Sequence, residues 1–237
     1  DKVAYFVDTY ANFNDHELGF AVLDALRHND VEVCLPAQRP SPVPAIVYGD
    51  VRLAKRDLAY SVKHLAKAVR DGCKVVCSEP SAALCLREEL RHYVGGEDAA
   101  LVSRNTVELM NYLADLRRQG KLKPPTASIA DKFAYHMPCH LSAVGDDTVT
   151  LRLLQEHFQI DVTDLQGGCC GLSGTFGMQQ KNYELATRIS ESLKTALRKA
   201  PTHNVLTECA ACRMQIEHIA PTSTVHPIKL IARSYGL

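Results

Sequence analysis

The sequence predicts an α/β protein built from two similar halves, because apolar strand-like segments alternate with amphipathic helical segments along the chain. Residues 1–5 and 131–135 share four of their five residues, at an offset of 130. A charged stretch with one glycine and two prolines, residues 117–125, separates the two parts and is typical of a linker. We therefore expect two pseudo-symmetric Rossmann-like halves, residues 1–123 and 124–237, each with a mostly parallel sheet flanked by helices.

The first half opens with a strand-like segment at residues 1–5, and a polar turn and an amphipathic helix follow it. The apolar residues of that helix lie at helical spacing: Leu18, Val22 and Leu26. A longer helix comes next, and its apolar residues have the same kind of spacing: Val51, Ala54, Leu58, Val62, Leu65 and Val69. A short strand is expected at residues 74–77, before a further helix.

The second half repeats this order, beginning with a strand at residues 133–137. The helix after it has its apolar residues on one face: Leu151, Leu154 and Phe158. Asp146 and Asp147 are available to cap the start of this helix. A second strand is expected at residues 160–165, and the helix after it is defined by four apolar residues: Leu185, Ile189, Leu193 and Ala196. A strand at residues 204–207 lies 130 residues after its counterpart in the first half, which extends the internal repeat.

Composition and charge exclude several classes of protein. Hydrophobic residues make up 46% of the 237 residues, which is enough for an ordinary globular core. Lysine plus arginine and aspartate plus glutamate both total 27, so the balanced charge gives no indication of a nucleic-acid partner. No apolar run approaches the roughly 20 residues of a membrane-spanning helix, and no secretory signal is visible. The chain begins at Asp1 without a methionine, so we expect it to be part of a longer protein.

Nine cysteines without a secretory signal indicate metal or redox chemistry in a reducing compartment, so we expect a cytoplasmic location. Five of them form a set in the second half, the five-cysteine set: Cys139, Cys169, Cys170, Cys209 and Cys212. A mononuclear structural zinc site takes four ligands, so five clustered thiolates are one too many for it. Iron–sulfur clusters are held by cysteine thiolates. The five-cysteine set therefore predicts an iron–sulfur site.

The three segments of the set each follow a predicted strand, and open α/β proteins place their ligands at the carboxyl ends of strands. Glycines around Cys169 and Cys170 permit positive φ, which allows backbone amides to point at sulfur. Cys209 and Cys212 are expected at the start of a helix, where the thiolate is favoured over the thiol. The positions 130 residues earlier contain no cysteine: Thr9, Arg39, Pro40, Glu79 and Ala82. We therefore expect the site only in the second half, with the first half as a scaffold or as one wall.

The remaining cysteines and the neighbours of the set have simpler interpretations. We expect the other four cysteines to be small apolar residues of the interior: Cys34, Cys73, Cys77 and Cys85. His136 and His140 flank Cys139, and we expect each to pack beside the site or to support a ligand rather than to bind metal. Arg213 is compatible with balancing the charge of the site and equally with an ordinary exposed position.

The cysteine segments carry a family resemblance. Pro-Cys-His at residues 138–140, Gly-Cys-Cys-Gly at 168–171 and Glu-Cys-Ala-Ala-Cys at 208–212 resemble the cysteine-rich CCG domain. That domain occurs in the B subunit of heterodisulfide reductase and in the iron–sulfur subunits of anaerobic glycerol-3-phosphate dehydrogenase, glycolate oxidase and lactate-utilisation complexes. The resemblance covers nearly the whole chain, and three further segments are similar to the dehydrogenase-linked branch: residues 8–13, 78–81 and 226–230.

The resemblance implies electron transfer through a [4Fe–4S] cluster bound by the five-cysteine set, a cluster that is noncubane in heterodisulfide reductase. The implied electron donor is a flavin-dependent dehydrogenase of a 2-hydroxy acid or of glycerol 3-phosphate, with FAD on a partner or on a missing domain. A ferredoxin-type domain and a membrane quinone-reducing partner are also implied, and they would hold the protein peripherally at the inner membrane. The first half departs from the family pattern at residues 39–41 and at Ala82, so we expect at most one cluster.

Other functions stay open at this point. In a zinc-binding or metal-free scaffold that docks a partner, four of the five cysteines would serve zinc. A dithiol oxidoreductase would use Cys209 and Cys212 without a metal, and a thiol–disulfide reaction like that of heterodisulfide reductase is a further alternative. We expect the chain to be the redox part of an oxidoreductase rather than a complete enzyme.

Overall fold

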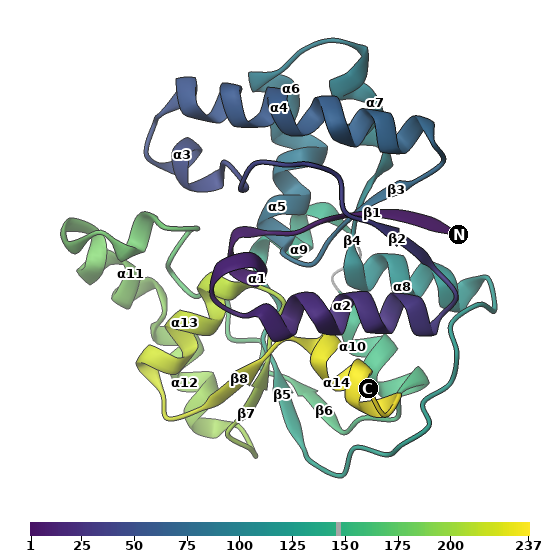
Figure 1. The fold of residues 1–237 in the computed structure, drawn as a ribbon. Coiled ribbons are helices and arrows are strands. Elements are labelled where there is room, and N and C mark those ends of the chain that lie inside the picture. The colour runs from purple at the N-terminus through teal and green to yellow at the C-terminus, as the bar shows by residue number, and fades with distance from the viewer. Residues whose placement is uncertain (146–147) are drawn as a thin grey trace.

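The computed structural model describes residues 1–145 and 148–237 and contains two four-stranded parallel sheets (Figure 1). The first sheet has the order β2-β1-β3-β4 and the second the order β6-β5-β7-β8. The strands of the first are β1 (Lys2–Phe6), β2 (Glu32–Cys34), β3 (Lys74–Cys77) and β4 (Thr106–Glu108). Those of the second are β5 (Phe133–Tyr135), β6 (Val162–Asp164), β7 (Asn204–Leu206) and β8 (Ser223–Val225). The shared order confirms the predicted α/β class with two Rossmann-like halves.

The internal repeat of the sequence reappears in the strands and in their side-chain contacts. β2 and β6 begin at residues 32 and 162, and β3 and β7 begin at residues 74 and 204. The Tyr5 hydroxyl hydrogen-bonds to Ser78 Oγ at 2.8 Å, and the Tyr135 hydroxyl donates to the Glu208 carboxylate at 3.1 Å. Each residue of the second pair lies 130 positions after its counterpart, so the two halves share internal contacts as well as topology.

Helices cover both faces of the first sheet. They are α1 (Thr9–Phe13), α2 (His16–His28), α3 (Val43–Val47), α4 (Val51–Arg70), α5 (Pro80–Leu84), α6 (Leu90–Tyr93), α7 (Glu97–Asn105) and α8 (Leu109–Arg118), with a π-helical turn at Cys85–Glu89. Carboxylates fix several helix starts: the side chain of Asp8 accepts from the backbone of α1, Asp15 from α2 and Asp50 from α4. Such caps satisfy amides that have no partner within the helix, which is why these helices begin where they do.

The second half has shorter helices. They are α9 (Cys139–Val144), α10 (Val149–Arg152), α11 (Tyr183–Ile189), α12 (Glu191–Lys199), α13 (Ala210–Ile219) and α14 (Pro227–Ser234), with a π-helical turn at Leu153–His157 and short 3-10 turns at Phe176–Met178 and Gln180–Asn182. The single helix predicted through Leu185 and Leu193 is wrong, because α11 and α12 meet at Ser190. The Ser190 hydroxyl donates to Thr187 O, a side-chain bond that competes with continuous helix. The predicted caps Asp146 and Asp147 lie outside the described residues.

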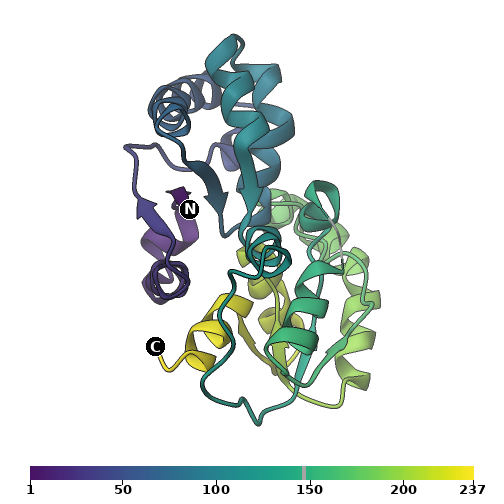
Figure 2. The same ribbon diagram turned by 90° about the vertical axis from the view of Figure 1, so that its right-hand side faces the viewer.

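One hydrophobic core joins the two halves. It combines Tyr5 and Leu26 of the first half with Phe133, Leu154 and Ile228 of the second, and all five side chains are buried. The helices α2 and α8 of the first half and α10 and α14 of the second lie between the two sheets (Figure 2). These helices bury their apolar faces against one another. Separating the two halves from each other would therefore expose a large apolar surface.

Candidate iron–sulfur site

The topology of the second sheet brings the five-cysteine set together. Cys139 is the first residue of α9 after β5, Cys209 is the N-cap of α13 after β7, and Cys169 and Cys170 lie in the loop that follows β6. β5 lies between β6 and β7, so the carboxyl ends of these three strands are neighbours. From β5 the chain continues to β6 on one side of β5 and then to β7 on its other side. The strand order therefore reverses at β5, and α/β sheets form ligand sites at such a switch point.

The five thiols are linked by contacts between their side chains. Cys212 donates to Cys170 with a Sγ–Sγ distance of 3.2 Å. Cys169 hydrogen-bonds to both Cys139 and Cys170, and Cys209 hydrogen-bonds to Cys212. The structure therefore brings together every member of the predicted set, although its three segments lie far apart in sequence.

The site is buried on one side and open on the other. The thiols of Cys170, Cys209 and Cys212 are buried, whereas Cys139 and Cys169 are exposed. Among the described residues, no three His, Cys, Asp or Glu side chains are arranged around a point that a single metal ion would occupy. Solvent therefore reaches the site at the edge formed by Cys139 and Cys169.

Glycine makes the Cys-Cys-Gly loop possible. Gly171 has φ +89°, and a Cβ at this position would collide with the carbonyl oxygen of Ala186. The tight turn directs the Gly171 amide at Cys169 Sγ, with an N–S distance of 3.3 Å. This is the amide-to-sulfur contact that the glycine-rich sequence predicted.

The electrostatics of the set favour thiolates at two positions. Hydrogen bonds from Cys139 and Cys170, together with the Gly171 amide, lower the pKa of Cys169 to about 2. A hydrogen bond from Cys212 and the backbone at the start of α13 lower the pKa of Cys209 to about 7. Thiolates are the metal-binding form of cysteine, so Cys169 and Cys209 are the two members of the set whose surroundings favour that form.

The first half supplies one wall of the site through Glu79. Its Oε2 accepts from the backbone amide of Ala210 at 2.8 Å, and its carboxyl hydrogen-bonds to the thiol of Cys209. Burial raises the pKa of Glu79 well above its usual range, so the neutral carboxyl is favoured. In the internal repeat, Glu79 is the counterpart of Cys209, 130 residues earlier in the sequence. The repeat alone indicates no function for Glu79. Through the contact with Ala210, the first half lies against the segment that carries Cys209.

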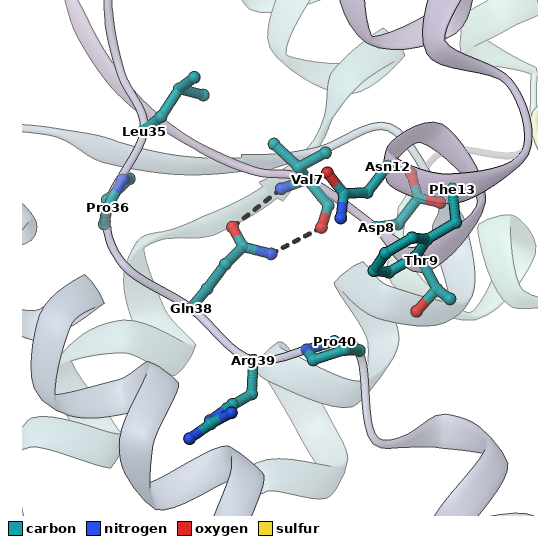
Figure 3. A pocket seen from close by; sticks show the side chains of 10 residues that line it. All are labelled: Val7, Asp8, Thr9, Asn12, Phe13, Leu35, Pro36, Gln38, Arg39 and Pro40. Atoms are coloured by element: carbon teal, nitrogen blue, oxygen red, sulfur yellow. Dashed lines mark hydrogen bonds between the residues drawn. The ribbon is translucent and has the colours of Figure 1, made fainter.

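The equivalent edge of the first sheet holds a pocket of about 330 Å³ instead of thiols (Figure 3). Thr9, Arg39 and Pro40, the counterparts of Cys139, Cys169 and Cys170, all line it. The side-chain amide of Gln38 accepts from Val7 N at 3.0 Å and donates to Val7 O at 2.6 Å, so it closes the strand end with a paired contact. The residues lining this pocket offer oxygen and nitrogen atoms but no soft ligand.

Three residues next to the five-cysteine set differ in burial and in their partners: His136, His140 and Arg213. His136 is buried, burial lowers its pKa to about 4, and its Nε2 has no partner among the described residues. His140 is half-buried, and burial lowers its pKa. Arg213 forms ion pairs with Asp15 at 2.8 Å and with Glu217 at 3.4 Å, so its charge is already matched by carboxylates.

The other four cysteines lie in the first half, away from the set. Cys73, Cys77 and Cys85 are buried among apolar side chains, as expected of small interior residues. Cys34 is only half-buried, and its Sγ lies 3.7 Å from Cys73 Sγ. This pair belongs to the face of the first sheet that packs against α4.

A buried carboxyl in the first half predicts a pH dependence of stability. Burial raises the pKa of Glu108 to about 7, although the amides of Met110 and Asn111 donate to its carboxylate. The folded state then holds a proton that the unfolded state releases above pH ~4.5. We expect the free energy of unfolding to fall by about 2.5 kcal/mol as the pH rises from 5 to 8.

The variant Glu108→Gln keeps an oxygen acceptor for the two amides and has no proton to lose, so its stability should depend less on pH over this range. Urea unfolding of both proteins at pH 5 and pH 8 measures the difference, and Glu97→Gln on the exposed start of α7 is the matched control. Parallel pH profiles for wild type and Glu108→Gln would refute this assignment.

Taken together, the two parallel sheets and the thiols at one switch point define a two-lobed α/β protein with a cysteine-rich centre. Comparison with known families agrees: residues 133–217 match the model of the CCG family, described as "Cysteine-rich domain". This match includes the whole five-cysteine set and confirms the predicted resemblance, so residues 133–217 are similar to a CCG cysteine-rich domain. Among the described residues, no helix has the length and apolar composition needed to cross a bilayer.

Curated relatives extend the similarity beyond this domain. The chain is 28% identical to the C subunit of anaerobic glycerol-3-phosphate dehydrogenase of Escherichia coli K12, over 99% of the chain and 59% of that relative. It is 24% identical to D-2-hydroxyglutarate dehydrogenase of the same strain, over 70% of the chain and 16% of the relative. It is 25% identical to lactate utilization protein A of Halalkalibacterium halodurans, over 81% of the chain and 77% of the relative. The chain therefore spans about three fifths of the length of the first of these relatives.

Proposed function

We propose that this chain is an electron-transfer module and that its five-cysteine set binds one iron–sulfur cluster of the [4Fe–4S] type. The single observation that carries the proposal is the convergence of five thiols from three distant segments at one sheet edge. Five thiolates exceed the need of a mononuclear zinc site, whereas a multi-iron cluster can use them all. The noncubane form is the finer proposal, supported by the similarity of the motif to that of heterodisulfide reductase.

The residues of this chain have separate roles in the proposed site. Cys139, Cys169, Cys170, Cys209 and Cys212 bind iron. The Gly171 amide and the start of α13 offset the negative charge on sulfur. Glu79 holds α13 from the other lobe. A bound cluster supplies one-electron transfer, and the polypeptide positions it near the exposed edge formed by Cys139 and Cys169.

The electron donor in this proposal is a flavin-dependent dehydrogenase of a 2-hydroxy acid or of glycerol 3-phosphate. Support comes from the names of the relatives, two of which are dehydrogenases or dehydrogenase subunits. The FAD would belong to that partner, and a ferredoxin-type domain and a quinone-reducing membrane partner would complete the chain of carriers.

Residues 1–123 and 124–237 are proposed as the two structural units. The nine unpaired cysteines support a cytoplasmic location, with membrane attachment only through partners.

Anaerobic reconstitution with iron and sulfide tests the proposed function. The loaded protein should absorb broadly in the visible range and give an EPR signal in one of its redox states. Stoichiometric zinc without bound sulfide, from the same reconstitution mixture supplied with both metals, would instead establish the zinc-binding alternative.

Glu79 offers a finer test of how the first half tunes the site. Hydrogen bonds to cluster sulfur raise the reduction potential, and Glu79 contacts Cys209 directly. We expect Glu79→Ala to lower the potential by on the order of 50 mV, which corresponds to about 1 kcal/mol for one electron. Glu79→Gln keeps one donor and one acceptor at the same place and should retain most of the potential. An EPR-monitored redox titration decides, and identical potentials for wild type and Glu79→Ala would show that this contact has no tuning role.

A further inference from the structure

Helix α4 carries a concentration of positive charge that the rest of the chain does not share. Its 20 residues contain six lysines and arginines and a single acidic residue, although the whole chain balances 27 cationic with 27 acidic residues. Four of these cations recur at spacings of four, seven and four residues, which places them on one face of the helix. We call these four residues the basic stripe: Arg52, Arg56, Lys63 and Lys67.

The basic stripe faces solvent along its whole length. All four of its side chains are exposed, whereas Leu58, Val62 and Leu65 on the other side of α4 are buried in the core of the first lobe. At 1.5 Å per residue, the stripe is about 22 Å long. Figure 1 shows α4 on the outside of the first lobe, away from the helices that lie between the two sheets. The stripe is therefore available for contact with another molecule.

The protein itself neutralises little of this charge. Arg56 forms an ion pair with Asp57 at 3.0 Å, whereas Arg52, Lys63 and Lys67 form none with any described residue of the chain. The stripe also contains two like-charge pairs four residues apart, Arg52 with Arg56 and Lys63 with Lys67, and such pairs destabilise a helix. Two such pairs on one exposed face indicate that the charge serves something other than the stability of α4.

An arginine from a second segment extends the stripe at its middle. The guanidinium carbon of Arg39 lies 5.0 Å from the centre of the Tyr60 ring, and the Arg39 amide donates to Ser61 Oγ at 3.0 Å. Both Arg39 and Tyr60 are exposed, and Tyr60 lies between the two like-charge pairs of the stripe. Tyrosine and arginine are among the residue types that contribute most to binding at protein–protein interfaces. This composition favours a folded protein as the partner.

The surroundings of the stripe disfavour the other anionic partners. Outside α4 the chain has more acidic than cationic residues, so an extended polyanion such as a nucleic-acid duplex would meet repulsion beyond the stripe. Helices that lie on a membrane insert an apolar face next to their basic residues. The apolar face of α4 is buried in the core of the first lobe and cannot be inserted. A compact patch of carboxylates on a protein satisfies both restrictions, and arginine binds carboxylates with paired hydrogen bonds.

We propose that the basic stripe, together with Arg39 and Tyr60, docks a carboxylate-rich patch about 20 Å long on the surface of a partner protein. The inference goes beyond the proposed function and does not depend on a bound cluster, because it rests on the charge, the exposure and the contacts of α4. Charge complementarity of this kind speeds association and sets the orientation of the partner.

A fluorescent peptide of ten glutamates, followed by anisotropy with the purified protein at 50 mM NaCl, tests the proposal. The wild type should bind it saturably, and 300 mM NaCl should weaken the binding because salt screens exposed charges. The variant Arg52→Gln/Lys63→Gln/Lys67→Gln should bind at least tenfold more weakly. Its three positions are exposed and glutamine is a good helix former, so the circular dichroism spectrum should match that of the wild type.

The matched control is Lys181→Gln/Arg198→Gln/Lys199→Gln, which also removes one arginine and two lysines from exposed positions. Its net charge equals that of the stripe variant, and it should bind the peptide within twofold of the wild type. Carbodiimide crosslinking then locates the peptide, because it joins a lysine amine to a carboxylate in direct contact. Mass spectrometry should find the peptide attached at Lys63 or Lys67 rather than at Lys181 or Lys199.

Three results would overturn the docking assignment. The first is the absence of saturable binding at 50 mM NaCl, and the second is equal weakening by the stripe variant and its control. The third is tighter binding of phosphatidylglycerol vesicles or of a ten-base-pair DNA duplex than of the glutamate peptide, compared at the same concentration of negative charge. All of these measurements use the protein without a cluster, so their failure leaves the proposed electron-transfer function standing.

Discussion

The variant Cys170→Ser is expected to lose the cluster after anaerobic reconstitution. Cys170 is buried at the middle of the thiol network, where it contacts both Cys169 and Cys212. A serine hydroxyl is a much poorer ligand for iron than a thiolate, and a buried site offers no replacement ligand. We expect the visible absorption and the bound iron and sulfide to fall to a small fraction of the wild-type values.

The matched control is Cys85→Ser, which makes the same change at a buried thiol of the first half. Cys85 is 1% exposed and packs in the apolar core around α4 and α7, away from the five-cysteine set. This variant should retain iron and sulfide, even if the buried hydroxyl lowers its stability by about 1–3 kcal/mol. The opposite result, with cluster loss in Cys85→Ser and retention in Cys170→Ser, would contradict the ligand assignment.

The second large effect is expected on stability, from Leu26→Ala in α2. Leu26 is fully buried in the core that joins the two lobes. Truncating a buried leucine to alanine typically costs about 2–5 kcal/mol, because apolar burial is lost and a cavity remains. Alanine has the higher helix propensity, so any loss of stability reports on packing rather than on the helix itself.

Phe20→Ala in the same helix is the control, because Phe20 is 63% exposed. Its effect should stay within about 0.5 kcal/mol. Urea unfolding followed by circular dichroism measures both variants. Because the core is shared, Leu26→Ala should shift a single transition that includes both lobes. Two separate transitions, with only the first lobe destabilised, would contradict the shared core.

The sequence predicted the architecture well because its strongest signals are local or periodic. The 130-residue repeat located the strands that begin at Lys2, Lys74, Phe133 and Asn204. The rule that α/β sheets collect ligands at the carboxyl ends of their strands was sufficient to predict that the cysteine segments meet. The break at Ser190 was missed because the apolar spacing continues across it, while a side-chain hydrogen bond interrupts the helix.

Contacts between the lobes were beyond the reach of the sequence. Nothing near Glu79 indicates that its carboxyl caps α13, since the partner Ala210 lies 131 residues away. The one signal in the sequence that connects Glu79 with the site is that it is the counterpart of Cys209 in the internal repeat. Such contacts depend on how the two lobes pack, which the pattern within each half does not determine.

The most direct test of the central claim is an anomalous difference map at the iron absorption edge, from crystals of the anaerobically reconstituted protein. The five-cysteine assignment predicts strong iron density within bonding distance of Sγ of Cys139, Cys169, Cys170, Cys209 and Cys212. Iron density elsewhere, such as beside Cys34 and Cys73, or a single zinc ion bound by four of the five thiols, would contradict it.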